Sequence, residues 1–337
     1  MIDSQEPSNF IRSLPKAELH VHLEGSIQPK TLLELRSRHG QDATAADVQQ
    51  LYRYSDFNGF LMAFKAVTED LRSPADYELI AYRLMQQFKA ENVLHAEVYV
   101  AVGVCLWRKL DFDAIFEGLE RGRERGECEF GVSVLWIFDA VRQFGPEAAR
   151  AVFEYAVRFR DQQVVGIGIG GDEQKAPPEL FRDAYDYAAA NGLHLTAHAG
   201  ENAGPESIWG ALNIRAERIG HGLAAAKDPE LIEELAVRQI PVEICLTSNL
   251  RTGCCRSLAE HPVRNYFDRG LMLTLNTDDP AMFSTSLNRE FQLAQDKFGF
   301  SDEHLSELAR NSFEASFLPP EQKLAFLNSF DAIRANR

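Results

Sequence analysis

The chain has 337 residues, of which 45% are hydrophobic and 25% charged, and its formal net charge is -15. This length and apolar content are typical of a globular enzyme with a large core, whereas the strong negative charge argues against a nucleic-acid backbone or an anionic membrane surface as a partner. No run of about 18 apolar residues predicts a membrane span, and no apolar leader follows Met1. We therefore expect a cytoplasmic protein that binds a small molecule, and no feature of the sequence predicts its oligomeric state.

Strand-like apolar runs alternate with segments of helical spacing along the whole chain. Gly192 follows one helical segment in the position of a C-cap, and Asp228 and Pro229 open another as N-cap and first helical residue. This alternation predicts a parallel sheet covered by helices. The predicted strands are residues 18–23, 94–101, 130–139, 164–170, 194–199, 218–222, 242–247 and 271–276, and the predicted helices are residues 57–71, 75–91, 112–125, 145–160, 179–191 and 228–238.

The number of these β/α units favours one closed arrangement. Eight such units form a (β/α)8 barrel, so we expect an α/β protein with a TIM-barrel fold. Residues 288–337 are expected to add C-terminal helices outside the barrel, and residues 1–337 to form a single domain. An open doubly wound sheet is the alternative, but the glycine-rich run at residues 166–171 lies mid-chain and lacks the later acidic residue that a dinucleotide site requires.

Metal-ligating residue types stand at the ends of several predicted strands. His20 and His22 are two apart on the first strand, so their side chains point to the same face. His198 and Asp278 follow two later apolar runs. At the carboxyl ends of barrel strands these residues would converge, and three imidazoles with one carboxylate leave an open position for water on a catalytic metal ion. The alternatives are a solvated histidine pair and, for Asp278, an N-cap before Pro280.

Three further residues have the chemistry for proton transfer close to such an ion. Glu201 follows His198 by three residues, and a carboxyl group beside a dry cavity can hold a raised pKa and donate a proton. His221 lies between two glycines and could orient or deprotonate a water molecule, and Asp279 could accept a hydrogen bond from a substrate N–H group. The alternatives are a helix-capping role for Glu201 and a hydrogen-bonded core position for His221.

Five segments in order resemble the adenosine deaminase family of the amidohydrolase superfamily. They carry the sequences LPKAELHVHLEG, HAGE, RIGHG, TSNLRTG and LNTDDP, at residues 14–25, 198–201, 218–222, 247–253 and 275–280. The similarity runs from about residue 14 to about residue 318, which is nearly the whole chain. Each segment alone is weak support, whereas the ordered set is specific. The resemblance implies a barrel of the metal-dependent hydrolase type.

The resemblance also implies a reaction and a role for each residue. One Zn²⁺ per chain would be held by His20, His22, His198 and Asp278, with Fe²⁺ or Mn²⁺ as alternatives for the same ligands. Water activated by the ion would add to C6 of a 6-aminopurine, and ammonia would leave. Glu201 would protonate N1, and His221 with Asp278 would orient and deprotonate the water. Asp279 would hold N7, and the backbone N–H of Gly171 would meet N3.

The remaining substrate contacts implied by the resemblance lie on the apolar and sugar sides. The segment at residues 57–71 resembles the mobile helix of the family, with Phe60, Leu61 and Phe64 as its apolar lid, although ordinary core positions are equally consistent with these three residues. Glu24 occupies the position of a ribose-contacting residue, which is usually Asp in relatives that act on adenosine and Glu in adenine-specific ones. Trp107 lies in a segment, residues 102–107, that departs from the usual pattern of the family.

The differences from the family pattern favour a purine nucleoside as the substrate, but they do not predict the group on its sugar. Residues 219–222 read Ile-Gly-His-Gly, whereas adenine deaminases commonly have Asp at the second position, and residues 281–288 resemble bacterial relatives that act on aminodeoxyfutalosine, an adenine nucleoside with a large 5′ group. We expect a small-molecule purine nucleoside, either adenosine or a 5′-extended adenosine. The alternatives are adenine, another metallohydrolase reaction and a non-catalytic nucleoside-binding protein. A two-metal site is disfavoured because the fourth strand ends in Gly170 and Gly171 rather than in lysine.

Overall fold

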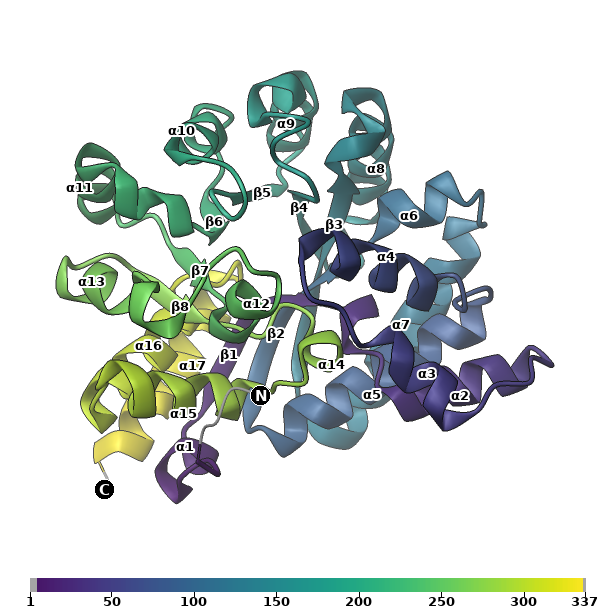
Figure 1. Ribbon diagram of the computed structural model, residues 1–337, viewed down its shortest axis with the longest axis horizontal. Helices are drawn as coiled ribbons and strands as arrows, with labels where there is room; N and C mark the ends of the chain where they lie inside the picture. Colours follow the sequence, from purple (N-terminus) through teal and green to yellow (C-terminus); the bar gives the residue numbers. More distant parts are fainter. Residues whose placement is uncertain (1–4, 336–337) are drawn as a thin grey trace.

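The computed structural model describes the backbone of residues 5–335 and the side chains of residues 5–331. Its centre is an eight-stranded parallel sheet in which each strand pairs with the next one along the chain, so the predicted (β/α)8 barrel is confirmed (Figure 1). The strands are buried on both faces, which explains their nearly continuous apolar sequences. They are β1 (Lys16–His22), β2 (Val93–Val100), β3 (Ser133–Val141), β4 (Val164–Gly170), β5 (His194–Ala199), β6 (Arg218–His221), β7 (Val242–Ile244) and β8 (Leu273–Leu275).

The first and last strands are joined by a side chain and a short backbone bridge. The Asn276 side-chain oxygen accepts hydrogen bonds from the backbone N–H groups of Leu19 and His20, at 2.9 and 3.1 Å. Beyond it, the Asp278 N–H donates to the His20 carbonyl at 3.0 Å, and the His22 N–H donates to the Asp278 carbonyl at 2.7 Å. This bridge places Asp278 directly beside the two histidines of β1.

Helices surround the strands, as Figure 1 shows. The predicted caps are confirmed: the Asp228 side chain accepts from the backbone N–H groups of Glu230 and Leu231 ahead of α11, and Gly192 follows α9 with φ of +81°. The helices are α1 (Asn9–Ser13), α2 (Pro29–Arg38), α3 (Ala45–Leu51), α4 (Phe57–Thr68), α5 (Pro74–Ala90), α6 (Val102–Trp107), α7 (Phe112–Phe130), α8 (Pro146–Phe159), α9 (Arg182–Ala190), α10 (Pro205–Asn213), α11 (Pro229–Arg238), α12 (Leu246–Arg251), α13 (Val263–Asp268), α14 (Pro280–Phe283), α15 (Leu287–Phe298), α16 (Asp302–Glu314) and α17 (Pro320–Ala335).

Several predicted boundaries are wrong by a few residues. The third strand begins at Ser133 rather than at residue 130, because α7 continues to a left-handed cap at Gly131. The seventh strand ends at Ile244, because the following residues form the short helix α12. Helix α4 ends at Thr68, three residues before the predicted end. The second of these differences matters most, because α12 carries two polar residues into the site.

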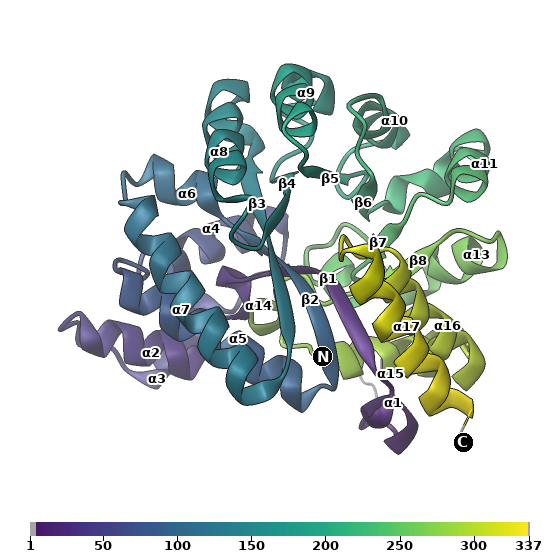
Figure 2. The ribbon, with the colours of Figure 1, turned by 180° about the vertical axis from the view of Figure 1, so that it is seen from behind.

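The C-terminal helices cover the seam between the first and last strands. In α16, the Ser312 hydroxyl accepts a hydrogen bond from the Ala17 N–H of β1, and the Asn311 amide donates to the Leu273 carbonyl of β8. Helix α17 lies against α16 (Figure 2), and the rings of Phe313 in α16 and Phe326 in α17 stack on one another. The assignment of residues 1–337 to a single domain stays a prediction. None of the helices within the described residues has both the length and the hydropathy needed to cross a membrane.

Candidate metal centre and active site

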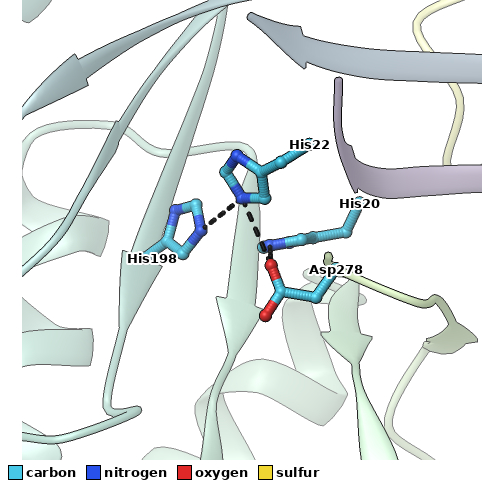
Figure 3. Close-up of side chains that lie close together, drawn as sticks. All are labelled: His20, His22, His198 and Asp278. Atoms are coloured by element: carbon cyan, nitrogen blue, oxygen red, sulfur yellow. Dashed lines mark hydrogen bonds and ion pairs between the residues drawn. The ribbon is translucent and has the colours of Figure 1, made fainter. Parts of the chain in front are cut away.

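The structure brings the four predicted metal ligands together at the carboxyl ends of the strands (Figure 3). One potential ligand atom from each of the four residues lies within 4.8 Å of those from the others, and all four residues are buried. The Nε2 atoms of His22 and His198 are 3.2 Å apart. The Asp278 carboxylate lies 3.5 Å from His20 Nε2 and 3.3 Å from His22 Nε2. Strands β1 and β5 and the turn after β8 supply the set.

The contacts within this cluster fit a bound divalent cation. Among the described residues, His20 Nε2 has no hydrogen-bond partner although it is buried, and such an atom is costly to leave unpaired. Burial lowers the pKa of the His20 imidazole, but the nearby carboxylates of Asp278 and Glu243 outweigh that effect and raise the pKa to about 10. The carboxylates thus favour a positive charge at this point, which a metal ion would supply. Three imidazoles and one carboxylate suit zinc and similar ions.

Three residues that the sequence analysis did not single out orient the ligands. Glu243 on β7 lies 2.7 Å from His20 Nδ1, and the Ile169 carbonyl on β4 accepts from His198 Nδ1 at 3.1 Å. The Ser248 hydroxyl on α12 donates to the Asp278 carboxylate at 2.6 Å. Such contacts fix the tautomer and direction of a metal ligand. Of these three residues, only Glu243 could have been found from the sequence, because it is a Glu within an otherwise apolar strand.

Two residues of the site have a backbone conformation that favours glycine. His221 and Asp278 both have φ of +64°. Left-handed backbone at a residue other than glycine costs on the order of 1 kcal/mol and is frequent at functional sites. Gly222 continues the left-handed turn after His221 with φ of +62°. The turn directs the imidazole of His221 inward, toward the metal cluster.

His221 is held in one orientation by a chain of polar contacts. Its Nδ1 accepts a hydrogen bond from the Asn249 amide on α12 at 2.9 Å, and the Asn249 oxygen lies 3.1 Å from His261 Nε2. The other ring nitrogen of His221 faces Glu201 at 3.7 Å and Asp278 at 4.0 Å. Burial lowers the pKa of His221 to about 3, so the imidazole is neutral at ordinary pH.

Glu201 is buried beside His221, and its surroundings favour the protonated form of its carboxyl group. Burial raises its pKa well above the usual range, and the negative charge of Asp278 raises it further. Its backbone is held by Glu173, whose carboxylate accepts from the N–H groups of Gly200, Glu201 and Asn202 at 2.7, 2.8 and 3.1 Å. Glu173 was not predicted as a site residue, since nothing in its local sequence indicates that contact.

A cavity of about 350 Å³ opens onto the cluster, within the range of small-molecule sites. Helix α4 and the end of α6 form much of its apolar wall. Glu24 does not line this cavity; its buried carboxylate accepts a hydrogen bond from the Ala101 N–H at 3.1 Å, and burial raises its pKa to about 7. The other predicted substrate contacts all line it, namely Phe60, Leu61, Phe64, Trp107, Gly171 and Asp279.

Asp279 is packed tightly against the turn after β1. A methyl group on Gly25 would lie only 1.8 Å from Asp279 Oδ1, so this position has room for glycine alone. That oxygen has no hydrogen-bond partner within the described part of the chain. Burial and the charge of Asp278 raise the pKa of Asp279 well above the usual range. The raised pKa favours the protonated form of this carboxyl group, which lines the cavity.

Asp139 on β3 is a polar residue of the cavity wall that was not predicted. It is 6% exposed, and its Oδ1 has no hydrogen-bond partner among the residues that the structure describes. The glycines of β4 make room for it, because side chains there would meet its carboxylate at 2.9 Å from Gly168 and 3.2 Å from Gly170. Burial raises the pKa of Asp139 to about 8. The glycine-rich run thus accommodates a neighbouring carboxyl group.

A histidine-rich metal site beside a buried carboxyl group, at the carboxyl ends of barrel strands, can activate water, so fold and site are those of a metal-dependent hydrolase. The family model described as "Adenosine deaminase" matches residues 15–333. The chain belongs to the adenosine deaminase family, and it is a purine deaminase with its metal site at His20, His22, His198 and Asp278.

Relatives and solved structures agree on the family and differ in the purine. The chain is 37% identical to the aminodeoxyfutalosine deaminase of Streptomyces coelicolor, over 99% of this chain and 89% of that protein. It is 34% identical to the adenine deaminase of Hahella chejuensis, over 97% and 99%. An amidohydrolase from Burkholderia ambifaria, solved with bound Zn, superposes with a TM-score of 0.89 at 28% identity and covers 98% of this chain and 96% of that one.

Proposed function

We propose that the protein is a zinc-dependent deaminase of a 6-aminopurine nucleoside, either adenosine or a 5′-extended adenosine such as aminodeoxyfutalosine. The products are the 6-oxopurine nucleoside and ammonia. The observation that carries this proposal is the buried carboxyl group of Glu201, which shares one cavity with the metal cluster and with His221. One Zn²⁺ per chain is proposed, with Fe²⁺ or Mn²⁺ as alternatives for the same ligands.

The bound ion supplies one element of the chemistry, because it lowers the pKa of a water molecule toward about 7. The chain's own residues supply the rest. We assign the orientation and deprotonation of the attacking water to His221 and Asp278, whose facing atoms lie 4.0 Å apart. Attack at C6 destroys the aromaticity of the ring, so negative charge develops at N1. A proton from Glu201 at N1 stabilises this charge more in the transition state than in the ground state.

Two further nitrogens of the purine, N7 and N3, have proposed hydrogen-bond partners in the cavity wall. N7 is an acceptor, and we assign it to Asp279, whose raised pKa favours the protonated carboxyl group that can donate to it. N3 is also an acceptor, and we assign it to the backbone N–H of Gly171. The apolar faces of the purine would lie against Phe60, Leu61 and Phe64 of α4. These contacts exclude water, which strengthens the electrostatic interactions inside the cavity.

The outer part of the cavity supports a substrate larger than adenine. The cavity extends from His22 and Asp139 to the mouth, where Trp107 stacks on Phe144 with ring centroids 5.7 Å apart. Lys65 of α4 lies 5.6 Å from the centre of the Trp107 ring. An aromatic pair with a nearby cation suits a substituent beyond the ribose. We assign the ribose hydroxyls to Asp139, and Glu24 acts behind it by fixing the start of α6.

Adenine is the second candidate substrate, and the relatives that are adenine deaminases favour it, as does Glu at position 24. The test is the loss of the near-ultraviolet absorbance of the 6-amino chromophore with zinc-loaded enzyme. The panel is adenosine, 2′-deoxyadenosine, 5′-methylthioadenosine, aminodeoxyfutalosine and adenine. The highest kcat/KM on a nucleoside supports the proposal, and the highest on adenine replaces it with the second candidate. Absence of turnover across the panel, with zinc bound, would point to a different metallohydrolase reaction.

A further inference from the structure

A buried arginine links two strands inside the barrel beneath the metal cluster. Arg218 begins β6 and is 1% exposed. Its guanidinium pairs with Glu97 of β2 and, through Nε at 2.7 Å, with Glu243 of β7. The interior of such barrels is usually filled with branched apolar side chains. Three charged residues in this layer therefore call for a functional explanation.

The chain of contacts ends at a metal ligand. One oxygen of the Glu243 carboxylate is near Arg218 Nε, and the other lies 2.7 Å from His20 Nδ1. Arg218 also donates to the carbonyl of Leu19, the residue before His20, at 3.4 Å. The Arg218 network thus contacts both the side chain of His20 and the peptide group that precedes it.

The other side of the network is closed by the segment after α16. Arg218 donates to the Ala315 carbonyl at 3.2 Å, and its guanidinium lies 3.9 Å from the centre of the Phe317 ring. Phe317 also stacks on His194 with centroids 4.1 Å apart, and its N–H donates to Glu97. This segment covers the network and keeps the guanidinium in place between its two carboxylates.

We propose that Arg218 is a positioning residue for the metal ligand His20 and that it acts through Glu243. The arginine holds one oxygen of that carboxylate, so the other stays aimed at Nδ1 and His20 presents Nε2 to the metal ion. Glu243 Oε2 also lies 3.4 Å from the Tyr99 hydroxyl, whereas Oε1 faces Arg218. Without Arg218, no other residue that the structure describes holds Oε1, so the carboxylate can turn and no longer keeps His20 in one direction. This inference rests on the proposed metal site but not on which purine is the substrate.

The test compares zinc affinities of the apoprotein by competition with a chromogenic chelator. Glu243→Gln should weaken zinc binding by about 10- to 100-fold, the range found for residues that orient metal ligands. Arg218→Met should weaken it by about tenfold. The double variant should bind zinc like Glu243→Gln alone, because the arginine has no route to the metal once the carboxylate is gone. The proposal would be overturned if the double variant lost zinc affinity by the product of the two single-variant factors.

A matched control is Arg123 of α7, a buried arginine that pairs with Glu120 and Glu127 away from the cluster. Arg123→Met should leave the zinc affinity unchanged, and an equal loss there would assign the Arg218 effect to general destabilisation. If Arg218→Met does not fold, Arg218→Lys replaces it, since lysine keeps the charge but lacks the fork that spans both carboxylates. Wild-type zinc affinity in Arg218→Lys overturns the proposal. A wild-type protein that binds no zinc would instead overturn the proposed function.

Discussion

The carboxylate of Glu173 accepts a hydrogen bond from the backbone N–H of Glu201 at 2.8 Å. The same carboxylate accepts from Gly200, from Asn202 and from the Ser207 hydroxyl, the last at 2.5 Å. One buried group therefore holds the whole turn that carries the proposed acid. Glu173 is 3% exposed, so these contacts are not replaced by water.

Glu173→Gln is expected to lower both stability and turnover. The amide keeps one acceptor oxygen but presents N–H groups to backbone donors, which costs about 2 kcal/mol for unpaired buried groups. The Glu201 carboxyl then loses its fixed position, so kcat should fall by at least about tenfold with a smaller change in KM. Urea unfolding and steady-state kinetics measure the two effects. Ser207→Ala, which removes one contact of the four, should show much less of both; equal effects would contradict the idea that the backbone contacts matter.

Glu201→Gln is expected to abolish turnover while zinc remains bound. The amide has nearly the same size but cannot donate a proton to N1, and such donation is worth about 10²- to 10⁴-fold in rate. Metal analysis and kcat on the best substrate check both parts. Cys254 contacts the Glu201 carboxyl at 3.8 Å, so Cys254→Ala is a neighbouring control that should retain most activity. Near-normal turnover in Glu201→Gln would remove the residue from the mechanism.

Gly25→Ala is expected to displace Asp279 and to lower kcat/KM by about 100-fold or more. The new methyl group would lie 1.8 Å from the carboxylate oxygen, a distance that no rotation of the backbone turn accommodates without moving Asp279. The thermal midpoint should fall as well. Ser26→Ala, at the next residue, removes only a hydroxyl that donates to the Leu23 carbonyl and serves as the control. Wild-type kinetics in Gly25→Ala would show that Asp279 needs no fixed position.

Asp139→Asn is expected to distinguish nucleosides from the free base. If its carboxyl group contacts a ribose hydroxyl, losing that contact costs about 1.4 kcal/mol and lowers kcat/KM about tenfold on nucleosides. Turnover of adenine, which has no ribose, should change little and provides the internal control. The measurement is the ratio of the two kcat/KM values in variant and wild type. An equal loss on both substrates would place Asp139 beside the purine instead.

Trp107→Ala is expected to affect only substrates with a large 5′ group. Trp107 is 56% exposed, so its removal should leave the thermal midpoint nearly unchanged. Loss of a stacking surface should raise KM for aminodeoxyfutalosine by about tenfold and leave KM for adenosine unaltered. Leu180→Ala, at a residue 55% exposed away from the cavity, is the control for an exposed apolar side chain. A uniform rise in KM would contradict a role for Trp107 in 5′ recognition.

The fold and the metal ligands could be predicted because both depend on local patterns. Alternating apolar strands and helices specify a parallel barrel, and its strand ends must meet at one face. His20 and His22 were identifiable from their two-residue spacing on one strand, and His198 and Asp278 because each follows an apolar run. For the predicted strands and helices, the errors lie at element ends, such as the strand beginning at Ser133, where local propensity does not specify the boundary.

The sequence by itself determined the barrel and the four residues of the metal site, whereas the residues for proton transfer stay a prediction. Only the tertiary structure decided which groups hold them in place. Glu243 contacts His20 across 223 positions of the chain, and Glu173 reaches Glu201 across 28. The sequence around Glu243 and Glu173 does not indicate which residue each of them contacts, because the curvature of the closed sheet sets their partners. For the same reason, only the structure shows that the Glu24 carboxylate contacts the start of α6, and a contact of Glu24 with the ribose stays a prediction.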